Sequence, residues 1–182
     1  EVTRLAAAFA AVFALAASVA GAETYRDRSV EIKAVPALDI DRYLGRWYEI
    51  ARFPNRFEEG CVGVTADYAL RDDGQVSVTN TCRKGALDGP VTTAEGVARV
   101  EGPGKLSVTF VPWLPFARGD YWVLYIDGGY TVAAIGTPRG KTGWILAREP
   151  RIGADMRARA EAALTANGYD TSKLIDVAQD PR

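Results

Sequence analysis

Few of the side chains that usually carry out catalysis are present in this sequence. The 182 residues include no histidine, two cysteines and one methionine. Without histidine, most zinc sites and every Ser–His or Cys–His nucleophilic pair are excluded, and two cysteines cannot form a four-cysteine metal site. Axial ligation of haem iron would fall to Met156, which is predicted to lie on the outer side of a helix. We therefore expect no metal and no other cofactor.

Glu49 and Tyr121 remain as candidates for proton transfer. The chain has 23 Asp and Glu residues, but no two of them form a pair on a predicted inward face. Glu49 is two residues after Trp47 in the alternating strand, so it is predicted to point inward as Trp47 does. No other carboxyl group is predicted beside it. A lone buried carboxyl group can act as an acid or a base, although we favour a structural, hydrogen-bonded role for this one.

Eight short β-strands are predicted to position these side chains. Runs that alternate between apolar and polar residues are separated by turn sequences rich in Gly, Pro and Asp. Consecutive strands joined by short turns form a meander, and closure into an antiparallel barrel removes both exposed sheet edges. The predicted strands span residues 47–52, 61–70, 75–81, 91–100, 105–111, 120–126, 130–136 and 141–147.

After the last strand, the spacing of apolar residues changes from that of a β-strand to that of an α-helix. Apolar residues at helical spacing predict one α-helix at residues 152–166, which ends at Asn167 and Gly168 and packs against the outside of the barrel. Residues 38–44 are predicted to form one helical turn, and residues 174–177 a short closing strand or tail. The expected fold is all-β: an eight-stranded up-and-down antiparallel barrel with one C-terminal α-helix.

The first 22 residues are predicted to be a secretory signal peptide. Arg4 precedes an apolar run at residues 5–20, and Ala20-Gly21-Ala22 offers a cleavage site. The alternative, a retained anchoring helix, would be short for a membrane span. No cysteine lies near the cleavage site, so we expect no lipid-modified N-terminus. The expected product is a soluble periplasmic or secreted protein with a polar lead-in, 23–36, and one domain, 37–182.

The charge pattern argues against nucleic acid as a partner. The net charge is −1, and basic and acidic residues are interspersed, whereas nucleic-acid binding needs a clustered positive face.

Cys61 and Cys82 are predicted to form a disulfide, as expected in an exported protein. They lie almost equally far from a hairpin turn at residues 71–74, which makes them cross-strand neighbours. Strict alternation would turn Cys61 outward and Cys82 inward, so a β-bulge near one of them is predicted. Two unpaired thiols are the alternative.

Three motifs resemble those of the lipocalins. They are Gly45-Arg46-Trp47-Tyr48-Glu49 at the first strand, residues 121–127 followed by Tyr130, and residues 143–150 with Arg148 near the end. Their order and spacing suit the bacterial branch of the family. The resemblance implies that Trp47 and Arg148 are structural and close the narrow end of the barrel, with the guanidinium over the indole.

The resemblance also implies a ligand cavity, which modest inward side chains would leave open. Simple core packing is the alternative, and Phe53 and Phe57 could instead fasten their loop to the rim. The predicted ligand-binding residues are Phe53, Phe57, Val64, Ala66, Tyr68, Val78, Asn80, Val108, Phe110, Tyr121, Val123 and Trp144.

The expected ligand is a fatty acid or a lysophospholipid, with its tail inside the barrel. Burial contributes about 0.8 kcal/mol per methylene, and Arg52, Asn55, Arg56 and Arg118 are candidates to meet a polar head at the rim. We expect a non-catalytic carrier or scavenger, as a monomer or a dimer.

Three alternatives remain open. A lipid isomerase or hydrolase would use Glu49 or Tyr121 as proton donor. An interaction protein would touch a membrane or partner through Trp113, Leu114 and Phe116. A tetrapyrrole or retinoid could replace the lipid.

Overall fold

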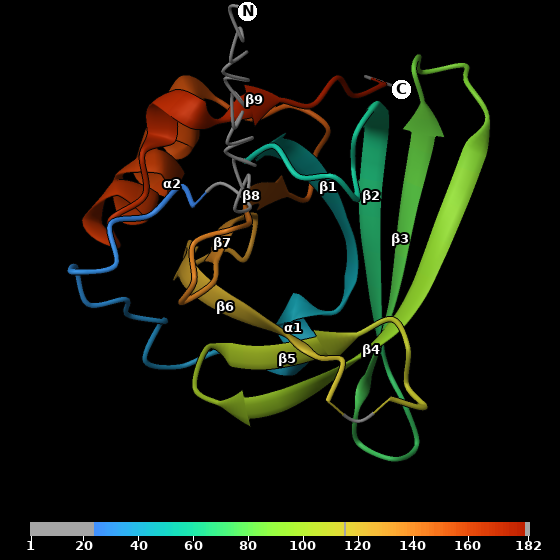
Figure 1. Ribbon diagram of the computed structural model, residues 1–182, viewed down its shortest axis with the longest axis horizontal. Coiled ribbons are helices and arrows are strands. Elements are labelled where there is room, and N and C mark those ends of the chain that lie inside the picture. The colour runs from blue at the N-terminus through green and yellow to red at the C-terminus, as the bar shows by residue number, and fades with distance from the viewer. Residues whose placement is uncertain (1–23, 115, 181–182) are drawn as a thin grey trace, which may run out of the picture.

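The computed structural model describes residues 24–114 and 116–180 (Figure 1). The predicted signal peptide, residues 1–22, lies outside the described residues, so its cleavage stays a prediction.

A closed antiparallel barrel of eight strands forms the centre of the described chain, as predicted (Figure 1). Neighbouring strands in the sequence pair with each other, and β1 pairs with both β2 and β8, which closes the barrel. The strands are β1 (Gly45–Arg52), β2 (Cys61–Leu70), β3 (Val76–Lys84), β4 (Val91–Gly102), β5 (Lys105–Thr109), β6 (Gly119–Ile126), β7 (Val132–Gly136) and β8 (Gly143–Ala147).

Strand β7 begins two residues later than predicted because Asp127 holds the preceding turn. Its carboxylate accepts hydrogen bonds from the amides of Gly129, Thr131 and Val132. Tyr130 has a φ of 58°, in the left-handed region that a strand excludes.

One end of the barrel, here called the closed end, is covered by helix α1 (Ile40–Tyr43). Trp47 is fully buried there and donates its indole N–H to the carbonyl of Tyr43 at 2.8 Å. The Arg148 guanidinium carbon lies 4.0 Å from the centre of a Trp47 ring, and its nitrogens donate to the carbonyls of Arg42 and Arg46. The cation–π contact and the main-chain bonds together fasten α1 and β1 to the end of β8. The opposite end, which carries the β1–β2, β3–β4, β5–β6 and β7–β8 loops, is the mouth.

Helix α2 (Ala154–Ala166) packs on the outside of the barrel, as predicted (Figure 1). It buries Ala160 and Leu164 against a cluster, here called the outer core, that lies between the helix and the barrel wall. The helix begins two residues later than predicted, after Gly153. A 3₁₀ helix, η1 (Thr171–Lys173), follows it. No helix in residues 24–114 and 116–180 is long and apolar enough to cross a membrane.

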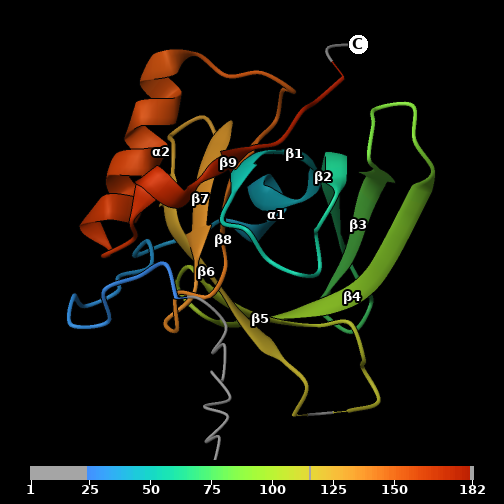
Figure 2. The same ribbon diagram turned by 45° about the horizontal axis from the view of Figure 1, so that its top comes forward.

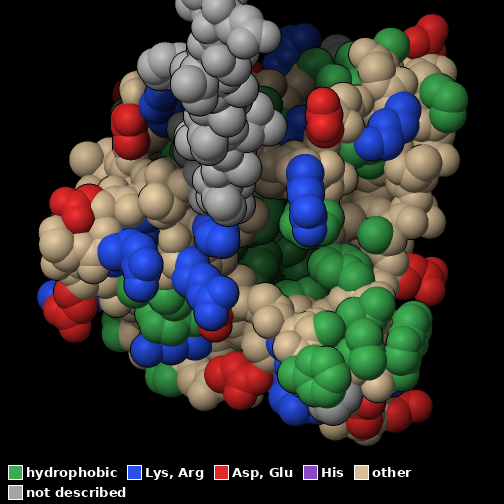
Figure 3. Space-filling view, viewed as in Figure 1, with side chains coloured by type: hydrophobic (Ala, Val, Ile, Leu, Met, Phe, Trp, Pro, Cys, Tyr) green, Lys and Arg blue, Asp and Glu red, His purple; other side chains and the backbone are tan. Residues whose placement is uncertain are grey.

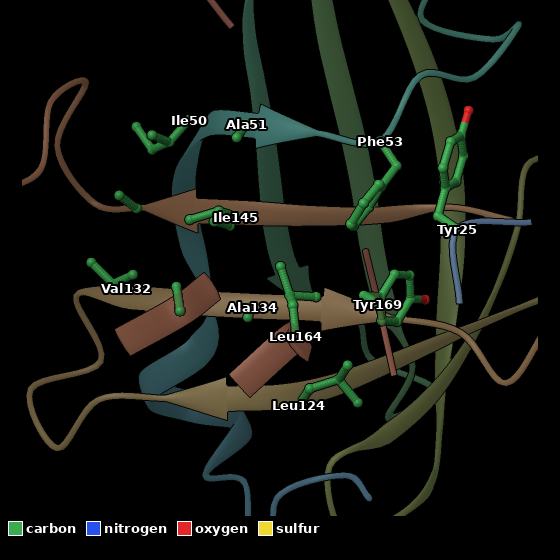
Figure 4. Packing of buried hydrophobic residues seen from close by; sticks show 12 residues of the cluster. Tyr25, Ile50, Ala51, Phe53, Leu124, Val132, Ala134, Ile145, Leu164 and Tyr169 are labelled. Atoms are coloured by element: carbon green, nitrogen blue, oxygen red, sulfur yellow. The ribbon is translucent and has the colours of Figure 1, made fainter. Parts of the chain in front are cut away.

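Phe53 belongs to this outer core and not to the rim, where it was predicted. It is fully buried, and its ring stacks on Tyr25 and on Tyr169, with centroids 5.0 Å apart in both cases (Figure 4). The reason is a β-bulge in β1, where the pairing with β8 shifts by one residue between Glu49 and Ala51. A bulge reverses the alternation beyond it. Phe53 therefore turns outward, and Arg52 turns inward.

A second bulge brings the two cysteines together. Cys61 and Cys82 form the predicted disulfide, with a Cα–Cα distance of 5.3 Å. The pairing of β2 with β3 shifts between Val62 and Thr65, as the sequence required. Gly63 lies inside the bulge with a φ of +56°, a conformation that glycine adopts readily.

The C-terminal segment joins β1 to β2 near the mouth, where the two strands diverge. Strand β9 (Ile175–Asp176) pairs with β1 (Figure 2). Beyond it, the carbonyl of Ala178 accepts from the amide of Gly63, and the Gln179 side chain donates to the carbonyls of Glu49 and Val64. The tail thus completes the wall around the buried part of the mouth.

Candidate functional site

The interior of the barrel is the candidate site. Figure 3 shows the surface hollowed over the middle of the barrel, with hydrophobic side chains at the bottom of the hollow. Ala66, Val108, Tyr121 and Trp144 pack against the inner cluster of buried residues and still retain accessible surface. Inward side chains of a closed barrel keep accessible surface only where the interior is not filled by other side chains.

Small residues line the side of the interior formed by β2 to β5. The register places Ala66 opposite Asn80, Val78 opposite Gly96, and Ala98 opposite Val108. A Cβ atom on Gly96 would lie 2.9 Å from the Phe110 ring, so glycine at this position lets Phe110 lie across β4. Phe110 remains 43% exposed near the mouth. These strands therefore present an apolar surface that other side chains leave partly uncovered.

Other predicted ligand residues take different places. Tyr68, Val78 and Val123 are buried in the inner cluster. Val64 is buried beside the disulfide and Val177. Phe57 is 75% exposed on the β1–β2 loop. Together with Phe53 in the outer core, these positions show that the twelve predicted residues form several groups and do not line one surface.

Three tyrosine hydroxyls meet inside the barrel, from Tyr43 on α1, Tyr68 on β2 and Tyr121 on β6. The hydroxyl of Tyr121 lies 2.7 Å from that of Tyr43 and 2.9 Å from that of Tyr68. Burial raises the pKa of all three groups, that of Tyr68 to about 12. The hydroxyls therefore stay neutral across the physiological pH range and act only as hydrogen-bonding groups.

Two carboxyl groups lie beside this tyrosine cluster. Glu49 points inward, as predicted, and is only 4% exposed, and its Oε1 atom lies 2.9 Å from Nη1 of Arg52. The carboxyl group of Glu58, on the β1–β2 loop, is a close neighbour of Glu49. Burial and the neighbouring Glu58 carboxylate raise the pKa of Glu49 well above its ordinary value, and Arg52 offsets only part of this. Glu49 therefore keeps its proton to a higher pH than an exposed carboxyl group does.

Glu58 is the principal residue that the sequence prediction missed. Its Oε2 atom accepts from the indole N–H of Trp144 at 2.9 Å and from the side-chain amide of Asn55. Asn55 in turn accepts from the amides of Phe57 and Glu58, which folds the loop back toward the barrel. The available signal was the Asn-x-x-Glu spacing, which resembles a capping box. Strand alternation could not predict this neighbour of Glu49, because Glu58 lies on a loop.

Two of the three arginines expected at the rim make hydrogen bonds within the protein. Arg52 is buried and donates to Glu49 and to the carbonyls of Glu58 and Cys61. Arg118 donates to the hydroxyl and the carbonyl of Ser107 on β5. Arg56 lies over the Phe57 ring at 5.0 Å. Two of the three guanidinium groups are thus already committed to hydrogen bonds within the protein.

Exposed apolar side chains on two loops of the mouth, β1–β2 and β5–β6, are here called the rim patch. Phe57 and Trp113 are each 75% exposed and Phe116 is 83% exposed, with Leu114 beside them in sequence. Figure 3 shows hydrophobic side chains gathered over the β5–β6 loop. Exposed aromatic residues in such a group commonly mark a contact surface.

Comparisons with known proteins agree with this architecture. Residues 38–179 match the family model described as "Lipocalin-like domain". The chain is 39% identical over 150 residues to outer membrane lipoprotein Blc of Escherichia coli (strain K12), covering 81% of this chain and 83% of that protein. It is 38% identical over 153 residues to temperature-induced lipocalin-1 of Arabidopsis thaliana, covering 79% and 81%. With apolipoprotein D of Mus musculus the identity is 34% over 151 residues, covering 78% and 77%.

Solved structures show the same fold. Insecticyanin from the tobacco hornworm Manduca sexta superposes with a TM-score of 0.64 at 22% identity, covering 82% of this chain and 85% of that one. The cockroach allergen Per a 4 gives a TM-score of 0.63 at 21% identity, covering 85% and 97%. The barrel, its outer helix and the family match lead to one conclusion: this chain belongs to the lipocalin family, whose members bind small hydrophobic ligands and are generally not enzymes.

Proposed function

We propose that this protein is a non-catalytic carrier or scavenger of a single-chain lipid, such as a fatty acid or a lysophospholipid, in the cell envelope. The observation that supports it most directly is the set of inward side chains that keep accessible surface, above all Ala66, Val108 and Trp144. They form an apolar interior that a hydrocarbon tail can fill.

The energetics suit this ligand class. Each buried methylene contributes about 0.8 kcal/mol, so a chain of about 16 carbons supplies a gross term of about 12 kcal/mol before the costs of association and ordering. Tight binding therefore needs no extensive polar recognition. The likeness to outer membrane lipoprotein Blc supports a place in the envelope, and the predicted signal peptide supports export.

Native mass spectrometry of the protein purified from periplasm, followed by organic extraction, tests this function. A stoichiometric adduct that extracts as fatty acid or lysophospholipid is the expected result. A bare mass, combined with no displacement of an apolar fluorophore by either lipid, would contradict it.

A second candidate function is contact with a membrane surface through the rim patch. The exposed rings of Phe57, Trp113 and Phe116 support it, because aromatic side chains at this exposure insert into the interfacial region of a bilayer. Vesicle flotation should retain the wild type and lose a Trp113→Ala, Phe116→Ala double variant. Leu70→Ala is the matched control, since Leu70 is 56% exposed on a β2 end far from the mouth. Absence of wild-type flotation rejects this candidate.

An enzymatic role for Glu49 or Tyr121 has a weaker basis. The Tyr121 hydroxyl is held by Tyr43 and Tyr68, and Glu49 by Arg52 and Glu58. Turnover of a bound lipid that is lost in Glu49→Gln while binding is retained is the result that would establish it.

A further inference from the structure

The carboxylate of Glu58 has no cationic partner in the described part of the chain. Arg52 reaches Glu58 only at its main-chain carbonyl and directs its other contacts to Glu49 and to the carbonyl of Cys61. The Glu58 side chain instead accepts from Trp144 and Asn55, and Glu49 is a close neighbour. The Glu58 carboxylate therefore lies where a cation from outside the described residues could pair with it.

Aromatic rings adjoin this carboxylate. The rings of Tyr121 and Trp144 lie 6.5 Å apart between centroids, with an angle of 25° between their planes, and both keep accessible surface. Trp144 is bonded to Glu58 through its ring edge, which leaves the indole face beside the carboxylate. A carboxylate next to accessible aromatic faces is the combination that attracts an ammonium ion, through Coulomb attraction and cation–π contact.

We propose that Glu58, Trp144 and Tyr121 bind the ammonium head of a single-chain lipid, an inference that rests on the lipid-carrier function proposed above. Glu58 and Trp144 lie toward the mouth, because Glu58 is on the β1–β2 loop and Trp144 follows the β7–β8 loop. The tail then lies along the small residues of β2 to β5. Glu58 disfavours a carboxylate head, because two negative charges would then lie side by side.

Ammonium binding should also affect Glu49. An ammonium ion beside Glu58 supplies a positive charge near Glu49, whose pKa burial and the Glu58 carboxylate raise. This positive charge favours the ionised form of Glu49 and so lowers its pKa. Burial raises the pKa of the neighbouring hydroxyls of Tyr68 on β2, Tyr121 on β6 and Tyr43 on α1, so these groups stay neutral.

Isothermal titration calorimetry with three ligands of the same 14-carbon tail tests the inference. Tetradecyltrimethylammonium, myristate and monomyristoylglycerol are compared at pH 7.5, below their critical micelle concentrations, in two buffers with different ionisation enthalpies. The ammonium ligand should bind about tenfold more tightly than myristate. The ammonium ligand should release more protons than the neutral ester, measured as a larger buffer dependence of its binding enthalpy, because its charge lowers the raised pKa of Glu49.

Glu58→Gln should remove both the preference for the ammonium ligand and the additional proton release, while the neutral ester still binds. Glu59→Gln is the matched control, because Glu59 is an exposed neighbour on the same loop. Myristate binding as tightly as the ammonium ligand, or an ammonium preference that persists in Glu58→Gln, overturns the inference and leaves the lipid-carrier function standing. Failure of all three ligands to bind overturns both.

Discussion

Trp144 donates its indole N–H to the Glu58 carboxylate at 2.9 Å, across 86 positions of sequence. This bond fastens the β1–β2 loop to the start of β8 and sets the shape of the mouth. It also joins a half-buried aromatic residue to a carboxyl group whose position the strand pattern does not reveal. The polar contacts around Glu58 at the mouth of this barrel therefore arise from a loop that folds inward and not from a strand.

Phe53 and Phe57 provide a matched pair for stability. Phe53→Ala should lower the free energy of unfolding by about 3–5 kcal/mol, because it leaves a cavity between Tyr25 and Tyr169. Phe57→Ala should change it by less than about 0.5 kcal/mol, since Phe57 is 75% exposed. Urea denaturation of the two variants measures the difference, and equal effects would contradict the outer-core position of Phe53.

Arg148→Ala should destabilise the protein without weakening lipid binding. The change removes a cation–π contact at 4.0 Å and hydrogen bonds to Arg42 and Arg46, with an expected loss of about 2–3 kcal/mol. Thermal denaturation and lipid titration are measured together. Arg151→Ala, at an exposed position beyond the same strand, is the control. A loss of lipid affinity with unchanged stability would contradict this prediction.

Replacing both cysteines by alanine should lower the free energy of unfolding by about 3 kcal/mol, because the disulfide closes a loop with a sequence separation of 21. The same shift should follow reduction of the wild type, and the reductant should have no effect on the double variant. If the reduced wild type and the untreated wild type unfold at the same denaturant concentration, the disulfide contributes nothing.

Glu49 should make stability depend on pH with a defined sign. Its pKa in the folded protein is raised above the ordinary value of 4.5, so the native state binds its proton more tightly than the unfolded chain does. The stabilisation is complete below pH 4.5 and is lost as the pH rises through the folded-state pKa. The difference in unfolding free energy between wild type and Glu49→Gln should therefore shift in favour of the variant from pH 5 to pH 8. A difference that stays constant would contradict the raised pKa.

Filling the interior should abolish lipid binding while the fold is retained. Val108→Trp places a large ring among small inward residues that keep accessible surface and should weaken binding at least about tenfold. Thr79→Trp is the control, because Thr79 pairs with Glu95 on the outer face of the neighbouring strands. Circular dichroism checks the fold, and fluorophore displacement measures binding. Equal affinities for the two variants would place the ligand outside the barrel.

The sequence predicted the strands, the outer helix and the disulfide because local patterns specify each of them. Alternation of apolar and polar residues marks a strand with one buried face, and helical spacing marks the outer helix. The bulge at Gly63 could be deduced as well, since the two cysteines had to face the same side. The bulge between Glu49 and Ala51 left no such signal, so Phe53 and Arg52 were predicted at the rim instead of in the outer core and the interior.

The sequence by itself thus determined the family, the barrel and the identity of the paired cysteines. Only the tertiary structure decided the chemistry of the interior. The bulge in β1 depends on the register with β8, and the inward turn of Glu58 depends on Asn55, Trp144 and Glu49. These partners come from separate elements, and a buried charge is tolerated only where all of them meet. No local pattern can carry that information, because burial and pairing arise only when the barrel closes.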